Sequence, residues 1–225
     1  VSIQILAVAA LASIGLAKHA YGGLGNNIFN PAMVGYAVIL LSFPQALAAW
    51  PALGGAENLA SDALSGATYL SEFRYRDAMT VDEFLLNNPQ VMHQQIIAGL
   101  FLLGGLGLIY LRIISWRIPL ALLITVGLLA SVTYDQGSTQ SMGSAWFHWA
   151  TGGTMAAAFF VATDPVTHPS RHSHQIIFAV SIGILLFVIR TQGNLPDGIA
   201  FAVLLANCAT PLLNRIHRQR EKQHV

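Results

Sequence analysis

Apolar stretches close to the length of a membrane-spanning helix recur along this chain. A helix needs roughly 20 mostly apolar residues to cross the hydrocarbon core of a bilayer. Six stretches approach that length and a seventh is shorter: residues 1–17, 32–50, 93–111, 118–133, 144–162, 175–190 and 199–213. Only 9% of the residues are charged and the mean hydropathy is +0.57, unlike a soluble domain. The pattern predicts an all-α integral membrane protein, a polytopic transmembrane helix bundle that forms one membrane domain over residues 1–225.

The connections between these stretches predict how the chain crosses the membrane. Lys and Arg near helix ends favour the cytoplasmic side. Seven crossings place Lys18, Arg112, Arg117, Arg171 and a cytoplasmic tail of residues 214–225 together on that side. Residues 51–92 then form an extracytoplasmic loop. Because the chain starts inside an apolar run, without Met or the features of a signal peptide, we expect a fragment that lacks N-terminal membrane helices.

Charge and cysteine content limit the partners and cofactors that this chain is expected to bind. Eleven Lys and Arg against ten Asp and Glu leave no basic excess, so no nucleic-acid partner is predicted. The single cysteine, Cys208, cannot by itself hold zinc or an iron–sulfur centre, which need several thiolates or imidazoles. We therefore predict no metal site and expect any cofactor to be organic.

The loop at residues 51–92 contains a motif that suits the attachment of a phosphorylated group. Ser65, Gly66 and Ala67 precede Thr68, and these small residues leave room for a bulky group to approach the Thr hydroxyl. Asp62 could hold a metal bound to an incoming phosphate or help to remove the Thr proton. On composition alone, an ordinary solvated turn is the alternative interpretation.

The motif Asp62-x-x-Ser65-Gly66-Ala67-Thr68 resembles the signature on which a flavin transferase attaches FMN to Thr through a phosphoester. Three longer stretches, residues 18–33, 159–166 and 196–207, extend this likeness over nearly the whole chain. The chain resembles the D subunits of Rnf electron transport complexes, which are relatives of the B subunits of sodium-translocating NADH:quinone oxidoreductases.

The resemblance implies a flavoprotein subunit of an ion-translocating oxidoreductase in a bacterial or archaeal cytoplasmic membrane. Such a subunit, inactive alone, passes electrons between ferredoxin-linked or NADH-linked redox partners, and the complex couples this to movement of Na⁺ or H⁺. The cofactors implied are covalent FMN on Thr68 and a noncovalent riboflavin. Thr68 would be an anchor and no residue of this chain a catalyst. The implied partners are the other Rnf subunits, a flavin transferase and the lipid bilayer.

A glycine- and asparagine-rich segment interrupts the apolar pattern before residue 32. It contains Gly22, Gly23, Asn26 and Asn30, and Pro31 suits the first turn of the following helix with Asn30 as its cap. A capped helix start after a glycine turn is the favoured interpretation, because such caps are common. A second flavin or quinone site is the alternative, since polar backbone at membrane depth lines cavities or is buried in protein.

Two acids lie at ends of the predicted helices. Asp164 and Asp197 are candidates for an ion pathway, because ionisable residues near membrane depth are often functional. Their Asp-Pro and Asp-Gly settings favour turns or caps instead. The Thr151-Gly152-Gly153-Thr154 sequence echoes the FMN motif, but it falls within an apolar stretch, where we expect a continuous helix with close packing and no flavin.

Two other functions compete with electron transfer. A solute channel or transporter without a redox role would also use glycine-broken helices and polar groups near the membrane midplane. A purely structural anchor for partner subunits is the third candidate, although it leaves the Thr68 motif without a role. Covalent flavin on this chain distinguishes the electron-transfer function from both.

Overall fold

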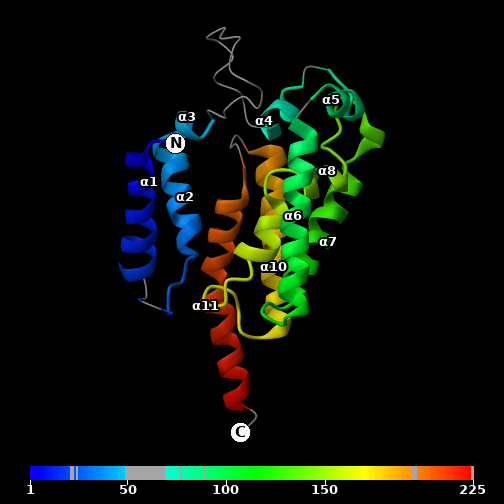
Figure 1. The fold of residues 1–225 in the computed structure, drawn as a ribbon. Coiled ribbons are helices and arrows are strands. Elements are labelled where there is room, and N and C mark those ends of the chain that lie inside the picture. Colours follow the sequence, from blue (N-terminus) through cyan, green and yellow to red (C-terminus); the bar gives the residue numbers. More distant parts are fainter. Residues whose placement is uncertain are drawn as a thin grey trace.

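The structure, a computed structural model, describes residues 1–20, 23, 25–48, 69–76, 78–88, 90–193 and 197–223. Within these ranges all regular elements are helices, which confirms the predicted membrane helix bundle (Figure 1). Helices satisfy their own backbone hydrogen bonds, as a bilayer requires. Six residues of the predicted sites lie outside the described ranges: Gly22, Asp62, Ser65, Gly66, Ala67 and Thr68.

The helices are labelled in chain order. The first seven are α1 (Ile3–Ala10), η1 (Leu11–Ala20), α2 (Pro31–Ser42), α3 (Pro44–Ala48), α4 (Tyr69–Arg74), α5 (Val81–Asn87) and α6 (Gln90–Tyr110). The others are α7 (Arg117–Val132), η2 (Asp135–Gly137), α8 (Ala145–Ala150), α9 (Thr154–Ala156), η3 (Ala157–Val161), α10 (His172–Gln192) and α11 (Ile199–Gln223). Among the described residues, three helical segments are long and apolar enough to cross a membrane: Ile3–Ala20, Val91–Tyr110 and His172–Gln192.

The first two predicted spans form a hairpin at one side of the molecule. The α1 helix continues into η1 without a break, and both pack against α2. A Cβ atom added to Gly35 would lie 2.0 Å from the Ser13 Oγ and 2.7 Å from the Ala9 carbonyl oxygen. The two spans therefore meet at a position that only glycine allows, and small residues commonly let membrane helices approach each other closely.

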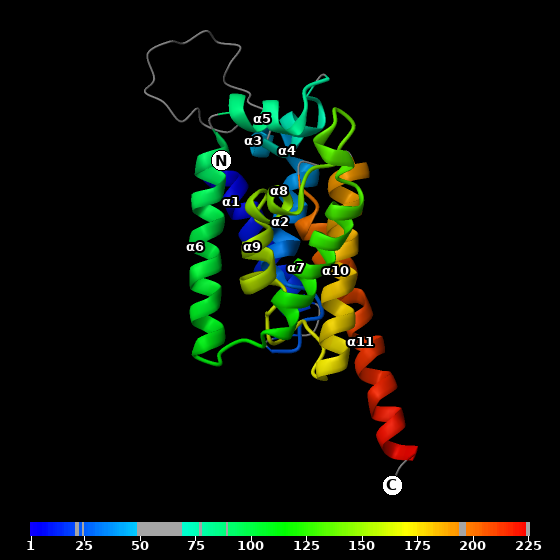
Figure 2. The same cartoon turned by 90° about the vertical axis from the view of Figure 1, so that its right-hand side faces the viewer.

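The main core lies between α7, α10 and α11. Its fully buried side chains include Leu122 and Val126 of α7, Ile182 and Leu186 of α10, and Val203 of α11. The α7 and α10 helices lie side by side and run in the same direction (Figure 2). Their first residues therefore lie at the same end of the bundle, and α11 returns beside them in the opposite direction.

The segment at residues 144–162 differs from the continuous helix expected there. It begins as expected, with Ser144 accepting a hydrogen bond from the Phe147 N–H, but α8 ends at Ala150. Gly152 and Gly153 then adopt φ values of +61° and +71°, in the left-handed region that favours glycine. These two residues break the helix, so the prediction that residues 151–154 lie inside a helix was wrong.

Two helix ends also differ from the expected spans. The stretch at residues 32–50 is divided at Phe43, which leaves the helical region directly before Pro44, as steric contact with a following proline favours. At the other end of the chain, α11 passes through Pro211 and ends at Gln223, beyond the expected limit at residue 213. Hydropathy marks the apolar part of a helix, whereas α11 continues as a polar helix.

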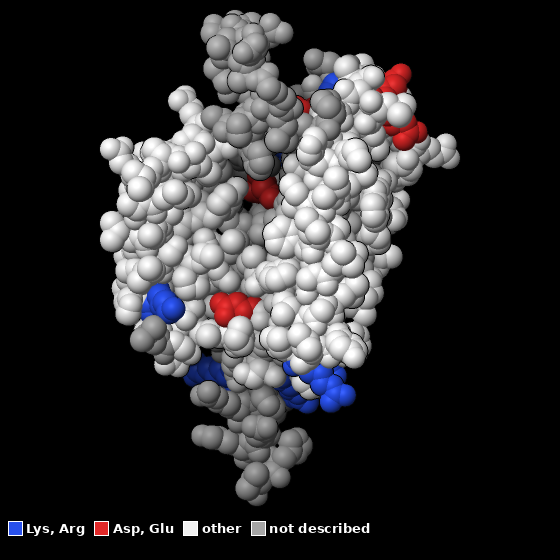
Figure 3. Space-filling model, in the orientation of Figure 1, with Lys and Arg blue, Asp and Glu red and all other residues white. Residues whose placement is uncertain are grey.

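Charge is distributed unevenly along the bundle. Lys and Arg side chains gather at the end where α6 finishes and α7 starts, and acidic side chains are seen at the opposite rim (Figure 3). The helix ends that carry Lys18, Arg112, Arg117 and Arg171 all lie at this basic end (Figures 1 and 2). This arrangement agrees with the predicted grouping of the basic connections on one side.

Candidate functional site

Helix α4 follows directly after the loop segment that carries the Thr68 motif, and an aromatic cluster holds it against the bundle. The Phe73 ring, whose residue is 6% exposed, lies 5.2 Å from the Phe84 ring and 4.0 Å from the Phe147 ring, centroid to centroid. Val81 of α5 completes this small core. Two short helices far apart in sequence, α4 and α8, are thus joined above the main core.

Arg76 fastens the residues after α4 to the loop between α7 and α8. Its guanidinium lies 4.1 Å from the centre of the Phe73 ring. It donates to the carbonyl oxygens of Phe73 (2.9 Å), Met79 (3.1 Å) and Thr139 (3.0 Å), and also to that of Ser141. Burial lowers the pKa of Arg76 below its ordinary value, although guanidinium remains charged at neutral pH.

Arg74 connects α4 to the end of α10. Its guanidinium donates to the carbonyl oxygens of Arg190 and Gly193. The last carbonyls of a helix have no partner within the helix, and a cation is favourable beside them. Arg74 therefore caps α10 and fixes the position of α4 at the same time.

Arg190 fills the gap made by the break after α8. Its side chain is 3% exposed, and its Nη1 donates to the His148 carbonyl oxygen (3.2 Å) and to the Thr154 Oγ1 (2.9 Å). Its Nη2 donates to the Gly152 carbonyl oxygen (3.2 Å) and to the Asp197 Oδ1 (3.2 Å). Carbonyls released by the broken helix would be costly if buried alone. The guanidinium satisfies them, and Asp197 balances its charge.

Two buried polar atoms beside this network have no hydrogen-bond partner. His148 is 2% exposed, and its Nε2 lies 2.9 Å from the Met142 carbonyl oxygen, so this nitrogen carries the proton when the bond forms. Its Nδ1 and the Nε of Arg190 are both buried and unpartnered. An unmet buried polar atom is unfavourable, so these two atoms indicate a place where a ligand could supply the missing bond.

These side chains line one pocket of about 360 Å³. We call it the arginine pocket and define it by six lining residues: Phe73, Arg74, Arg76, Phe147, His148 and Arg190. Three guanidinium groups line the pocket, and only that of Arg190 is paired with a carboxylate, that of Asp197, so the local potential is positive. Two phenyl rings provide apolar contact. An anionic ligand with a planar apolar part fits this combination, and the volume lies within the usual range for small-ligand sites.

Thr68 lies outside the described residues, and its link to this pocket is one of sequence. Leu70 lines the pocket and is only two residues further along the chain. The Thr154 hydroxyl, by contrast, is buried and donates to the His148 carbonyl oxygen (2.6 Å), which leaves it unsuited to flavin attachment.

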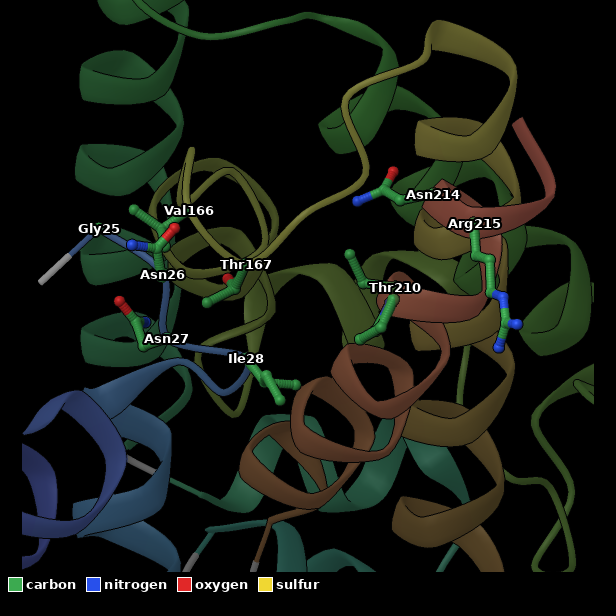
Figure 4. A pocket seen from close by; sticks show the side chains of 10 residues that line it. Gly25, Asn26, Asn27, Ile28, Val166, Thr167, Thr210, Asn214 and Arg215 are labelled. Atoms are coloured by element: carbon green, nitrogen blue, oxygen red, sulfur yellow. The ribbon is translucent and has the colours of Figure 1, made fainter. Parts of the chain in front are cut away.

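A second pocket, of about 460 Å³, lies near the basic end of the bundle. Asn26 and Asn27, from the segment before α2, lie across it from Thr210, Asn214 and Arg215 of α11 (Figure 4). We call it the amide pocket. Of the residues predicted for a second flavin or quinone site, Asn26 lines this pocket, whereas Gly23 and Asn30 are not among its lining residues.

Asn30 acts as the predicted helix cap. Its Oδ1 accepts from the Met33 N–H (3.2 Å) at the start of α2, and its Nδ2 lies 3.4 Å from the Asp164 Oδ2. Asp164 also accepts from the Val166 N–H and the Thr167 hydroxyl, each at 3.2 Å. Asn30 thus forms a helix cap, and Asp164 forms a turn with the residues that follow it.

The structure does not bring Asp164 and Asp197 together. Asp164 follows η3, whereas Asp197 lies two residues before the start of α11. Asp197 binds Arg190 and lies 3.4 Å from the Ile199 N–H. Two separate acidic areas are visible along the hollow between the hairpin and the rest of the bundle (Figure 3). An ion pathway through both residues stays a prediction.

Several residues of the arginine pocket were not identified from the sequence. Arg190 appears there only as the last residue of an apolar stretch, and Arg74 and Arg76 as the basic residues of an acidic loop. Their partners lie far away in the chain: Arg74 binds carbonyls 116 and 119 residues away. The one usable signal was the Gly152-Gly153 pair inside an apolar stretch, which indicates a break that some donor must fill.

Comparison with known proteins places the chain in a family. The D subunit of the ion-translocating oxidoreductase complex of Ectopseudomonas mendocina is 37% identical over 223 residues, which cover 92% of this chain and 65% of the relative. The proteins of the same name from Stutzerimonas stutzeri and Buchnera aphidicola are 39% and 38% identical, and the matches cover 92% and 90% of this chain and 67% and 68% of those relatives.

The chain thus spans about 65% of the length of the first of these relatives. Its similarity is not confined to the motif stretches, because residues 1–223 match the family that contains NQR2, RnfD and RnfE. This match includes the helices that build both pockets. The chain therefore belongs to the NQR2, RnfD, RnfE family.

Proposed function

We propose that this chain is the membrane flavoprotein subunit of an ion-translocating electron transport complex and carries covalent FMN on Thr68. The names of its relatives support the kind of complex. The observation that carries the cofactor proposal is the arginine pocket, a positive and partly aromatic cavity that begins two residues after Thr68. The other subunits of the complex are the proposed partners, and a flavin transferase would perform the attachment.

The pocket residues fit the proposed cofactor. A phosphate esterified to both Thr68 and a ribityl chain keeps one negative charge, which the three guanidinium groups of the pocket favour. Phe73 and Phe147 offer apolar contact for a ring system. The unpartnered His148 Nδ1 and Arg190 Nε leave hydrogen-bonding capacity beside the pocket.

When bound, FMN supplies the electron chemistry, and the protein supplies position and electrostatics. Arg74 and Arg76 use their donors mainly to hold α4 and the 138–141 loop in place. Their charges remain, and they favour negative charge in the pocket. The covalent bond to Thr68 would keep the cofactor at a high effective concentration in place of free diffusion. The rigid attachment of α4, which follows Thr68 in the chain, would limit the positions that the cofactor can reach.

The proposed orientation places the Thr68 loop outside the cytoplasm and the tail of residues 214–225 inside. It rests on the basic end described above, since Lys and Arg favour the cytoplasmic side. Reporter fusions at Asn87 and at His224 test it. Opposite locations are expected, and a shared location would exclude this orientation. Coupling to Na⁺ or H⁺ movement, with Asp164 and Asp197 as pathway candidates, is part of the proposal.

The amide pocket is the proposed site of noncovalent riboflavin. Amide and hydroxyl side chains suit hydrogen bonds with an uncharged polar ring system, and the buried Thr210 Oγ1 has no partner. We expect Thr210→Val to release riboflavin while covalent FMN stays, and Thr68→Ala to have the opposite effect. Acid extraction separates the two flavins, so the measurement is the ratio of extracted to protein-bound flavin.

The broken helix at α8 also bears on the transporter alternative. Transporters use such breaks because freed backbone carbonyls can coordinate a cation. Here Arg190 occupies the carbonyls of His148 and Gly152. A resident guanidinium leaves these oxygens unavailable to a transported cation, which favours the electron-transfer function.

Substitution of Thr68 tests the main proposal. Thr68→Ala removes only the attachment oxygen, and the cost in stability is expected to stay within about 0.5 kcal/mol for a surface position. We expect the fluorescent flavin band on a denaturing gel to disappear while the complex still assembles. Ser170→Ala is the control, because it also removes an exposed hydroxyl group and Ser170 lines neither pocket.

Two further variants separate attachment chemistry from cofactor binding. Thr68→Ser keeps a hydroxyl and is expected to retain part of the flavin, whereas Asp62→Ala should reduce attachment if this carboxylate assists the transferase. A covalent flavin that persists in Thr68→Ala would refute the site. Absence of covalent flavin from the wild-type protein would refute the function itself.

A further inference from the structure

An apolar groove of about 580 Å³ runs along the outer surface of α7 and α10. One wall is a single face of α7 with residues spaced three or four apart, and the other is a matching face of α10. The groove residues used below are Leu120, Ile124 and Leu128 of α7 and Ile176, Val180 and Ile184 of α10. From Arg117 to Leu128 the rise of the helix makes the groove about 17 Å long.

The floor of the groove is closed. A Cβ atom added to Gly183 would lie 2.8 Å from the Cβ of Thr125 and 3.2 Å from the Leu122 carbonyl oxygen, so α7 and α10 touch beneath the groove. Its rim is exposed: Leu128 is 63% exposed and Ile124 is 49% exposed. The groove is therefore an open furrow on the outer surface of the bundle and leads nowhere inside the protein.

Polar groups line this furrow mainly at one end. Arg117, the first residue of α7, lies there with its guanidinium 5.3 Å from the centre of the Trp116 ring. Among the described residues no ion pair is found for Arg117, so no described carboxylate neutralises it. Trp and Arg at the end of a membrane helix are typical of the level of lipid headgroups.

We propose that this groove is a binding site for one anionic phospholipid, with its acyl chain in the furrow and its headgroup phosphate beside Arg117. The two parts of the site match the two parts of the ligand. The Arg117 cation matches the anionic headgroup, and the apolar furrow beyond it matches the acyl chain. Basic groups at the membrane surface attract anionic lipids by about 1 kcal/mol each. Trp116 supports the headgroup region because its ring is apolar and its N–H can donate.

A helix of another subunit fits this groove less well. Helices in membranes pack through small residues that let their backbones approach, whereas bulky Leu and Ile side chains form the rim here.

Native mass spectrometry of the assembled complex, loaded with phosphatidylglycerol or phosphatidylcholine, tests the proposal. Wild type is expected to retain phosphatidylglycerol preferentially on this subunit. Arg117→Gln should weaken that preference about fivefold, the factor that corresponds to roughly 1 kcal/mol. Arg117→Lys should restore most of it. Arg112→Gln is the matched control, because Arg112 lies at the same end outside the groove.

Ile124→Trp is a second test, since it fills the furrow without changing charge. It should reduce retention of both lipids, while flavin content and assembly stay normal because the position faces outward. Equal retention of the two lipids by wild type would overturn the proposal, as would equal effects of Arg117→Gln and Arg112→Gln. Loss of a neighbouring subunit in Ile124→Trp would identify a helix as the occupant and overturn it as well.

Discussion

Gly152 and Gly153 have similar backbone conformations but different surroundings, so alanine at each position gives a sharp test of the site geometry. Both have φ near +65°, where an alanine costs roughly 1 to 2 kcal/mol. The Cβ of an alanine at 152 would lie 2.4 Å from the Leu70 Cδ1 and 2.7 Å from the Arg190 Nη2. At 153 the nearest atom would be the Ile199 Cδ1, at an ordinary 3.4 Å.

The difference between the two variants can be worked from these contacts. Leu70 can turn aside, but Arg190 cannot move without weakening its bonds to Asp197 and to the carbonyl oxygens of the broken helix. One hydrogen bond to a charged group is worth roughly 1.5 to 3 kcal/mol. We therefore expect Gly152→Ala to cost about 2 kcal/mol more than Gly153→Ala.

Thermal unfolding of the purified complex, followed by near-ultraviolet circular dichroism, measures this difference. For a chain of this size, 2 kcal/mol corresponds to about 4 to 8 °C in Tm. A double variant with Leu70→Ala should recover little stability, because the contact with Arg190 remains. Equal Tm values for Gly152→Ala and Gly153→Ala would refute the argument that Arg190 is fixed at the break.

Three other predictions follow from named contacts. Asp197→Ala leaves the Arg190 charge buried without its partner. It should lower the free energy of unfolding by about 3 to 5 kcal/mol, measured as a fall in Tm. A normal Tm would show that the ion pair is dispensable for stability. Phe73→Ala should cost roughly 3 kcal/mol and make the residues around α4 sensitive to limited proteolysis, and an unchanged digestion pattern would contradict the anchoring role. Hydrogen bonds from Thr80 lower the pKa of Glu83 below its ordinary 4.5; its contribution to α5 is therefore full above pH 4.5 and is lost as pH falls through the lower folded value. Hydrogen exchange of the α5 amides should become faster as the pH falls through this range. The Glu83→Gln variant should lack this pH dependence.

The pattern of the sequence was enough to predict the membrane bundle and several of its local features. Length and hydropathy of a stretch are local properties, and a bilayer accepts few structures other than helices, so the all-helical fold could be predicted. The cap formed by Asn30 before Pro31 depends on residues a few positions apart, and it was predicted for the same reason. The grouping of the basic connections at one end could also be predicted, because successive crossings place every second connection on the same side of the membrane.

The arginine pocket depended on tertiary structure. Hydropathy averaged over residues 144–162 conceals two glycines in the left-handed region, and nothing local to Arg190 shows that it lies beside carbonyls about 40 residues earlier. These partners are chosen by packing: the contact of α7 with α10 and the aromatic cluster around Phe73 bring α4, α8 and α10 to one end of the bundle. A linear pattern determines which segments enter the membrane, whereas the satisfaction of buried carbonyls and charges is decided only when those segments meet.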